Sequence, residues 1–323
     1  MEENSKQEIY LPFNNVFLNA GFINGDNSPS KYVLTIIVTI LSYFTYQIFI
    51  GFVFVYYAQQ QGINIYDAQK ISEVLQNPSI LGISKNFLIT LLLGMFVFTF
   101  LTFYIAIKKI HQKAFISVVT AFPDIRWSRV FFAFLVWSVI FILMFLADFI
   151  FISPENYTLN FQWEKFLPLL FISILLLPIQ TSFEEIFFRG YLMQGIALAT
   201  KNGIIALITT SLLFGLAHIS NPEVEKFGVL SMLPFYTLFG LFLGLLALWN
   251  SGLELSLGIH AANNLLSALL ITSENTVLQT DAIFSIKNEN PSVDFMLWLI
   301  GAVITFVIFQ YKFKFKNHFQ NLK

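Results

Sequence analysis

The chain contains no cysteine among its 323 residues. Disulfide bonds, thiolate metal sites and cysteine nucleophiles are therefore excluded. Charged residues are also scarce, at 11% of the chain, whereas about one quarter is usual in a globular protein. No basic patch is interleaved with aromatic residues, so the sequence indicates no binding to nucleic acid. Apolar residues dominate instead: 56% of the chain is hydrophobic, and 39 residues are phenylalanine.

We also expect no cleavable signal peptide. The first residues, MEENSKQEIYLPFNN, are polar and acidic, and no basic stretch precedes a short apolar one. We expect the first apolar segment to act as its own insertion signal.

Long apolar segments are the main feature that is present, and each is near the length needed to cross a bilayer as a helix. The sequence therefore predicts an all-α fold, a polytopic membrane bundle of about eight transmembrane helices. The expected spans are 32–57, 86–107, 130–152, 166–183, 203–219, 227–249, 253–272 and 294–311. The first three and the last are almost free of polar residues, whereas the middle four contain several.

This contrast divides the chain into an N-terminal membrane scaffold of about three helices at 1–160, a polar core at 161–275, and a C-terminal helix with a basic tail at 276–323. Lysine and arginine are concentrated in the connecting segments on one side of the bundle. The positive-inside rule then predicts a multi-pass protein of the plasma (inner) membrane with both termini in the cytoplasm. His111 and His318 lie beside lysines on that side, and we expect both to be solvated.

Two glutamates and an arginine interrupt the apolar sequence in EEIFFR. Because charge is costly in a membrane, such residues indicate a functional site. Glu185 and Arg189 are one helical turn apart, so they can pair on one face. Glu184 is rotated by about 100° from Glu185 and is not part of that pair. The alternative interpretation is a solvated salt bridge at a helix end.

Two histidines also lie in apolar segments. FGLAHIS places Phe214 and His218 one turn apart, and GIHAANN does the same for His260 and Asn264. A single histidine in an apolar helix is more often a satisfied structural group than a catalyst. Two histidines and an unpaired Glu184 are three costly groups, and it is unexpected that all three would be buried independently of one another. Together they favour a functional site.

These side-chain types are suited to hydrolysis by an activated water. A glutamate in an apolar site can take a proton from water and pass it to a leaving amine, while a neutral histidine orients that water. A histidine and an asparagine amide can donate hydrogen bonds to a developing oxyanion. GxSxG and HExxH motifs are absent, and Ser182 has no histidine in local register. Water-mediated amide hydrolysis fits best.

The three motifs resemble those of a known family. EEIFFR, FGLAH and HAANN match the EExxxR, FxxxH and HxxxN motifs of the CPBP family, in the same order and with similar separations. That family comprises the CAAX prenyl endopeptidases and the bacteriocin-processing or self-immunity proteins, also called Abi. The resemblance extends from Phe166 to Leu270 and implies an intramembrane protease. Residues 161–275 would then be its catalytic core, a helical bundle with a polar cavity toward the cytoplasm.

The resemblance also implies a role for each motif residue. Glu184 and His218 would activate the water. His260 and Asn264 would stabilise the oxyanion. The supporting residues would be Glu185, Arg189 and Phe214.

A metal is the open question about cofactors. The family is also described as a metalloprotease family, and Glu184, His218 and His260 could coordinate zinc with one open position. A glutamate-activated water needs no metal, so we favour a reaction without a cofactor and keep zinc as the alternative.

Three functions stay open on the sequence alone. The preferred one is an intramembrane endopeptidase that acts on a membrane-associated or leader-type peptide, or on a membrane protein, within the lipid bilayer. The second is a non-catalytic membrane partner or regulator of the same fold, for example in bacteriocin self-immunity; the intact motif residues argue against it. The third is a proton-coupled transporter, which would predict inverted repeats, and the sequence shows no repeat.

Overall fold

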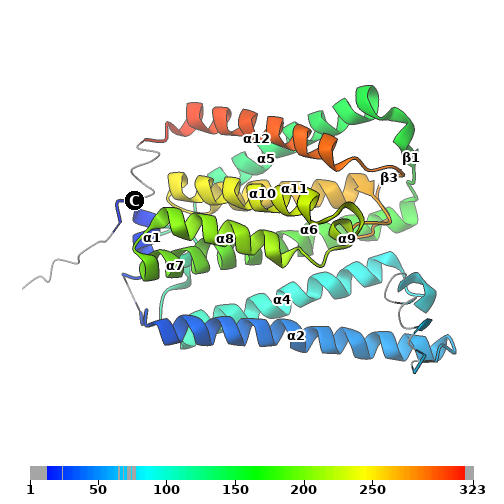
Figure 1. Cartoon of the computed structure of the whole chain (residues 1–323), viewed down its shortest axis with the longest axis horizontal. Coiled ribbons are helices and arrows are strands. Elements are labelled where there is room, and N and C mark those ends of the chain that lie inside the picture. The colour runs from blue at the N-terminus through cyan, green and yellow to red at the C-terminus, as the bar shows by residue number, and fades with distance from the viewer. Residues whose placement is uncertain are drawn as a thin grey trace, which may run out of the picture.

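The apolar segments form helices that run back and forth between two ends of a bundle (Figure 1). The structure is a computed structural model, and it describes residues 13–23, 25–64, 66–67, 69–70, 74 and 78–316. Each expected span coincides with a helix. These helices are α2 (Pro29–Gln60), α4 (Lys85–Lys109), α5 (Trp127–Ala147), α6 (Trp163–Glu185), α8 (Gly203–Ala217), α10 (Val229–Asn250), α11 (Glu254–Leu270) and α12 (Pro291–Phe313).

The prediction of an all-α, polytopic membrane bundle is confirmed, but the number of eight spans is not. Within the described residues, six helices are long and apolar enough to cross a membrane. The two that fall short are α8, with 15 residues, and α11, with 17. Both helices lie next to or carry motif residues. Much of α11 is buried inside the bundle and does not form its outer surface.

The helix that carries EEIFFR is longer than expected. α6 contains Pro168 and Pro178 and continues through a π-helical segment, η5 (Ile186–Leu192), into α7 (Met193–Thr200), so that 163–200 is one continuous helical stretch. The sequence placed the end of this span at residue 183. π-Helical turns inside α-helices occur frequently at functional sites, and this one begins directly after the two glutamates.

Short elements occupy the two ends of the bundle (Figure 1). One end holds α1 (Val16–Ala20) and η2 (Phe115–Val118). The other end holds α9 (Pro222–Phe227) and a three-stranded sheet in the order β1-β3-β2. β1 (Tyr157–Leu159) pairs antiparallel with β3 (Phe284–Ile286), and β2 (Ile271–Thr272) pairs parallel with β3. The remaining short helices are η1 (Pro78–Leu81), η3 (Asp148–Ile152) and η4 (Pro154–Asn156).

Close packing places α11 in the middle of the bundle, against α5 and α6. At Gly258 an added Cβ atom would lie 2.2 Å from the carbonyl oxygen of Val130 on α5. Only glycine therefore allows this approach. Buried apolar side chains from α5, α10 and α11, among them Trp137, Leu243 and Ile259, complete the packing around it.

His111 is not solvated, so the expectation for it is wrong. Its side chain is buried, and its Nδ1 lies 2.7 Å from the carbonyl oxygen of Asp26 while its Nε2 lies 2.8 Å from the hydroxyl of Tyr191. The reason is that the chain before α2 folds over the segment that follows α4. Burial lowers the pKa of His111. His318 lies outside the described residues.

Candidate active site

Three helices bring the sequence motifs together inside the bundle. The glutamates are the last residues of α6, His218 is the residue that ends α8, and His260 and Asn264 lie one turn apart on α11. α6 and α11 are in direct contact, and the π-helical segment after α6 packs against α8.

Glu185 is the centre of a buried ion cluster. Its Oε1 atom accepts one hydrogen bond from Arg189 Nη1 at 2.8 Å and another from His260 Nδ1 at 2.7 Å. The three residues are 0%, 1% and 3% exposed. The predicted one-turn pair of Glu185 and Arg189 is therefore confirmed. The contact with His260 adds that the second glutamate of the motif also orients a histidine on another helix.

Glu184 is held at one oxygen and free at the other. Its Oε1 atom accepts a hydrogen bond from Gln180 Nε2 at 2.6 Å. Its Oε2 atom has no hydrogen-bond partner among the described residues and lies 3.6 Å from His260 Nε2. The His260 ring thus lies between the two carboxylates, with one nitrogen facing each. Glu184 is only 8% exposed, so its free oxygen is shielded from solvent.

The cluster holds two carboxylates, those of Glu184 and Glu185, and one guanidinium, that of Arg189, which is paired with Glu185. Buried charges in proteins are generally paired in this way.

His218 joins the cluster through aromatic rings. Its Nδ1 lies 2.7 Å from the carbonyl oxygen of Phe214, which can only accept, so Nδ1 carries the proton and Nε2 is left for other partners. Its ring stacks on Tyr236 with centroids 4.3 Å apart. The ring of Phe214 contacts the rings of both histidines, with centroids 4.6 Å from His218 and 6.1 Å from His260.

Two residues of this site were not identified from the sequence. Gln180 bonds to Glu184 and also accepts a hydrogen bond from Asn264 Nδ2 at 3.2 Å. The signal for Gln180 was present, since it is a polar residue one turn before Glu184 in an apolar run. Tyr236 had no such signal, because its contact with His218 depends on how α10 packs against α8.

The described residues do not complete a zinc site. No group of three or more His, Asp or Glu side chains within them is placed to hold a metal ion. Glu184 and His260 could supply two ligands, but no third His, Asp or Glu side chain of the described residues joins them as a metal site. A catalytic zinc needs three protein ligands and an open position, so the set predicted from sequence does not fit this arrangement.

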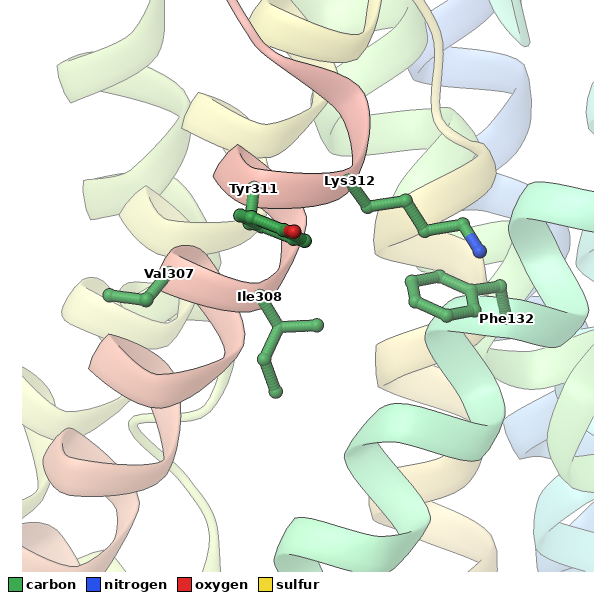
Figure 2. Close-up of a pocket in the computed structure, with 5 residues that line it drawn as sticks. All are labelled: Phe132, Val307, Ile308, Tyr311 and Lys312. Carbon is green, nitrogen blue, oxygen red and sulfur yellow. The ribbon is translucent and has the colours of Figure 1, made fainter.

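A groove elsewhere on the bundle is not part of this site. It has a volume of about 500 Å³ and runs between α5 and α12 on the outer surface, where Figure 2 shows Lys312 extending over the ring of Phe132. The other residues that line it are Val307, Ile308 and Tyr311. None of the five is a carboxylate or a histidine, the residue types that make up the motif site.

Comparisons with known proteins point to the segment that holds the motifs. Residues 162–266 match the family model described as "Type II CAAX prenyl endopeptidase Rce1-like". The chain is also similar to "Uncharacterized protein YyaK" of Bacillus subtilis (strain 168), with 34% identity over 190 residues, which are 58% of this chain and 63% of the relative. The similarity thus spans slightly less than two thirds of the relative's length. No solved structure matches the chain significantly.

Proposed function

We propose that this multi-pass membrane protein, whose residues 162–266 match the Rce1-like family model, is an intramembrane endopeptidase. In this proposal a water molecule, activated by Glu184, hydrolyses a peptide bond of a membrane-associated peptide or membrane protein. The chemistry takes place at the ion cluster between α6 and α11.

One observation carries the proposal more than any other. The Oε2 atom of Glu184 is an unpartnered carboxylate oxygen, 3.6 Å from His260 Nε2, in a bundle of apolar helices. An unpaired buried acceptor is costly to stability, and a bound water would satisfy this one. A general base needs a free lone pair within hydrogen-bond reach of the water that it activates.

The proposed reaction conserves atoms and protons. Glu184 Oε2 takes a proton from water as the water oxygen bonds to the scissile carbonyl carbon, and the carbonyl oxygen becomes an oxyanion. Protonated Glu184 then gives its proton to the amide nitrogen while the C–N bond breaks. The products are a carboxylic acid and an amine. His218 Nε2, which has no role in its own helix, is available to orient the water.

Two donors are available for the oxyanion. Asn264 has two N–H groups, and the contact with Gln180 uses one of them. A proton on His260 Nε2, which lies 3.6 Å from Glu184 Oε2, would provide the second donor. Hydrogen-bond donors that are fixed in place before the reaction usually make the largest contribution to stabilising the transition state of acyl transfer.

The family description sets the first substrate to test. It names a CAAX prenyl endopeptidase, so an internally quenched peptide with a farnesylated CAAX end is the first probe. Leader-type peptides without a lipid are the second.

The test compares the purified protein with two variants in detergent. We expect cleavage by the wild-type protein, loss of turnover with retained thermal stability in Glu184→Gln, and unchanged turnover in Glu164→Gln. Glu164 is an exposed glutamate in the first turn of the same helix. Equal activity in wild type and Glu184→Gln would contradict the role of Glu184. Absence of cleavage across both peptide classes would favour a non-catalytic membrane partner of the same fold.

A further inference from the structure

A chain of four hydrogen bonds leads from α5 through α11 to Glu184 on α6. Trp137 Nε1 donates to Asn263 Oδ1 at 3.3 Å, and Asn263 Nδ2 donates to Asn264 Oδ1 at 3.2 Å. Asn264 Nδ2 then donates to Gln180 Oε1 at 3.2 Å, and Gln180 Nε2 donates to Glu184 Oε1 at 2.6 Å. Each side-chain amide accepts on one side and donates on the other.

The two ends of this chain fix its direction. The indole of Trp137 can only donate a hydrogen bond, and the ionised carboxylate of Glu184 can only accept one. Each amide between them has one acceptor oxygen and one donor nitrogen, so turning over any one of them would place donor against donor or acceptor against acceptor. The orientation of all three amides therefore follows from the chemistry of the two end groups.

From this geometry we propose that Trp137, Asn263 and Gln180 are positioning residues, which orient Glu184 and Asn264 for the proposed hydrolysis. The inference rests on the proposed function for its catalytic meaning. The hydrogen-bond chain itself can be tested without any activity.

Burial at both ends makes this hydrogen-bond chain costly to break. Trp137 is fully buried, Gln180 and Glu184 are 7% and 8% exposed, and Asn263 and Asn264 between them are half-buried. A buried amide such as that of Gln180 needs its partners, because an unsatisfied polar group inside a protein costs more than a satisfied one gains. The close approach of α11 to α5 at Gly258 keeps the tryptophan within reach of Asn263.

The chain has two effects on the reacting groups. It occupies Glu184 Oε1, which leaves Oε2 as the oxygen that faces His260 and the water. It also occupies one N–H of Asn264, which directs the second N–H elsewhere. Trp137 lies outside residues 162–266, which match the family model. A helix of the N-terminal scaffold thus contributes to the geometry of the motif residues.

The first experiment follows the indole N–H signals of ¹⁵N-tryptophan-labelled protein in detergent by NMR. The protein has five tryptophans, and the signal that disappears in Trp137→Phe is the one from Trp137. We expect Asn263→Ala and Gln180→Leu both to shift the Trp137 signal. The control signal is that of Trp298, another buried tryptophan, whose Nε1 has no hydrogen-bond partner among the described residues; it should not move. A Trp137 signal that is unmoved by Gln180→Leu would show that the two side chains are not linked by hydrogen bonds, and the proposal would be wrong.

The second experiment measures peptide cleavage. Trp137→Phe keeps an aromatic ring and removes only the N–H, so we expect kcat to fall about tenfold with little change in KM, equivalent to about 1.4 kcal/mol in the barrier. Gln180→Leu should have a similar or larger effect. The double variant should lose no more than the worse single variant, since both changes break one chain. Trp298→Phe is the matched control and should keep the wild-type kcat.

The two experiments separate the two ideas. If the wild-type protein cleaves no peptide while the Trp137 signal responds to Gln180→Leu, the hydrogen-bond chain is supported and the proposed function is contradicted. If cleavage occurs but the losses of Trp137→Phe and Gln180→Leu multiply in the double variant, the residues act independently and the positioning role is refuted. A fall in kcat for Trp298→Phe equal to that for Trp137→Phe would also refute it, because packing alone would then explain both.

Discussion

Glu185 Oε1 accepts a hydrogen bond from His260 Nδ1 at 2.7 Å, between residues 75 positions apart in the sequence. The same oxygen accepts from Arg189 one turn along its own helix. Glu185 is therefore more than the partner of an arginine, because it also fixes the ring orientation of the histidine that faces Glu184. A change at Glu185 should disturb both the packing of the motif helix and the position of His260.

We expect Glu185→Gln to lower both stability and turnover. Removing one partner from a buried ion pair leaves the other charge uncompensated and costs about 3–5 kcal/mol. Arg189→Ala should have a similar cost, because it leaves Glu185 with His260 alone. The measurements are thermal unfolding in detergent, the amount of protein in the membrane and the rate of peptide cleavage.

Glu184→Gln is the control for this prediction, since we expect it to lose turnover at an unchanged unfolding temperature. The assigned roles are reversed if Glu184→Gln keeps full activity while Glu185→Gln, still folded, loses it.

The helical fold could largely be predicted from the sequence, because apolar segments of membrane length are visible without any packing information. Six helices meet that description. The short lengths of α8 and α11 could not be predicted, because a window of apolar residues does not reveal that His218 ends α8 or that α11 is buried within the bundle. The division into a scaffold, a core and a C-terminal helix stays a prediction.

The site could be predicted where it depends on spacing within one helix. The pair of Glu185 and Arg189 follows from their separation by one turn, and the same rule would have found Gln180. The links that cross between helices could not be predicted. Trp137 reaches Asn263, and Tyr236 stacks on His218, only because α5 and α10 pack against the motif helices.

Stability should depend on pH through Lys113. This lysine is 2% exposed, its Nζ donates to the carbonyl oxygen of Gly21 and to Asn27 Oδ1, and burial lowers its pKa to about 8. In the unfolded chain its pKa returns to about 10.4, so between these values the unfolded state binds more protons. The free energy of unfolding should therefore rise with pH from about 8 to about 10, and below this window the cost of burying the charge is fully present.

The measurement for Lys113 is the unfolding temperature at pH 7.5 and 9.5. Lys113→Met should remove part of the rise, whatever its effect at a single pH, and Lys109→Met, at an exposed lysine, should retain it. An identical pH dependence in wild type and Lys113→Met would contradict the prediction.

Both termini should face the cytoplasm, as the distribution of lysine and arginine predicts. The absence of cysteine from the chain allows a direct test, because a single introduced cysteine is then the only site for a thiol reagent. Lys109 ends α4 at one end of the bundle and Glu164 begins α6 at the other, and both side chains are exposed. In intact cells, an impermeant maleimide should label Glu164→Cys, and it should label Lys109→Cys only after permeabilisation. The opposite pattern would invert the orientation.

Peptidase activity should survive removal of metal ions. A zinc site would require nitrogen and oxygen ligands from Glu184, His218 and His260 at about 2.0–2.2 Å from one ion. Among the described residues, no three His, Asp or Glu side chains are placed to hold one metal ion. We expect protein dialysed extensively against a chelator to keep its turnover and to contain well under one zinc per chain by elemental analysis. Loss of activity on chelation, with recovery on addition of stoichiometric zinc, would show that these residues move to coordinate a metal and would replace the glutamate-activated water by a metal-bound one.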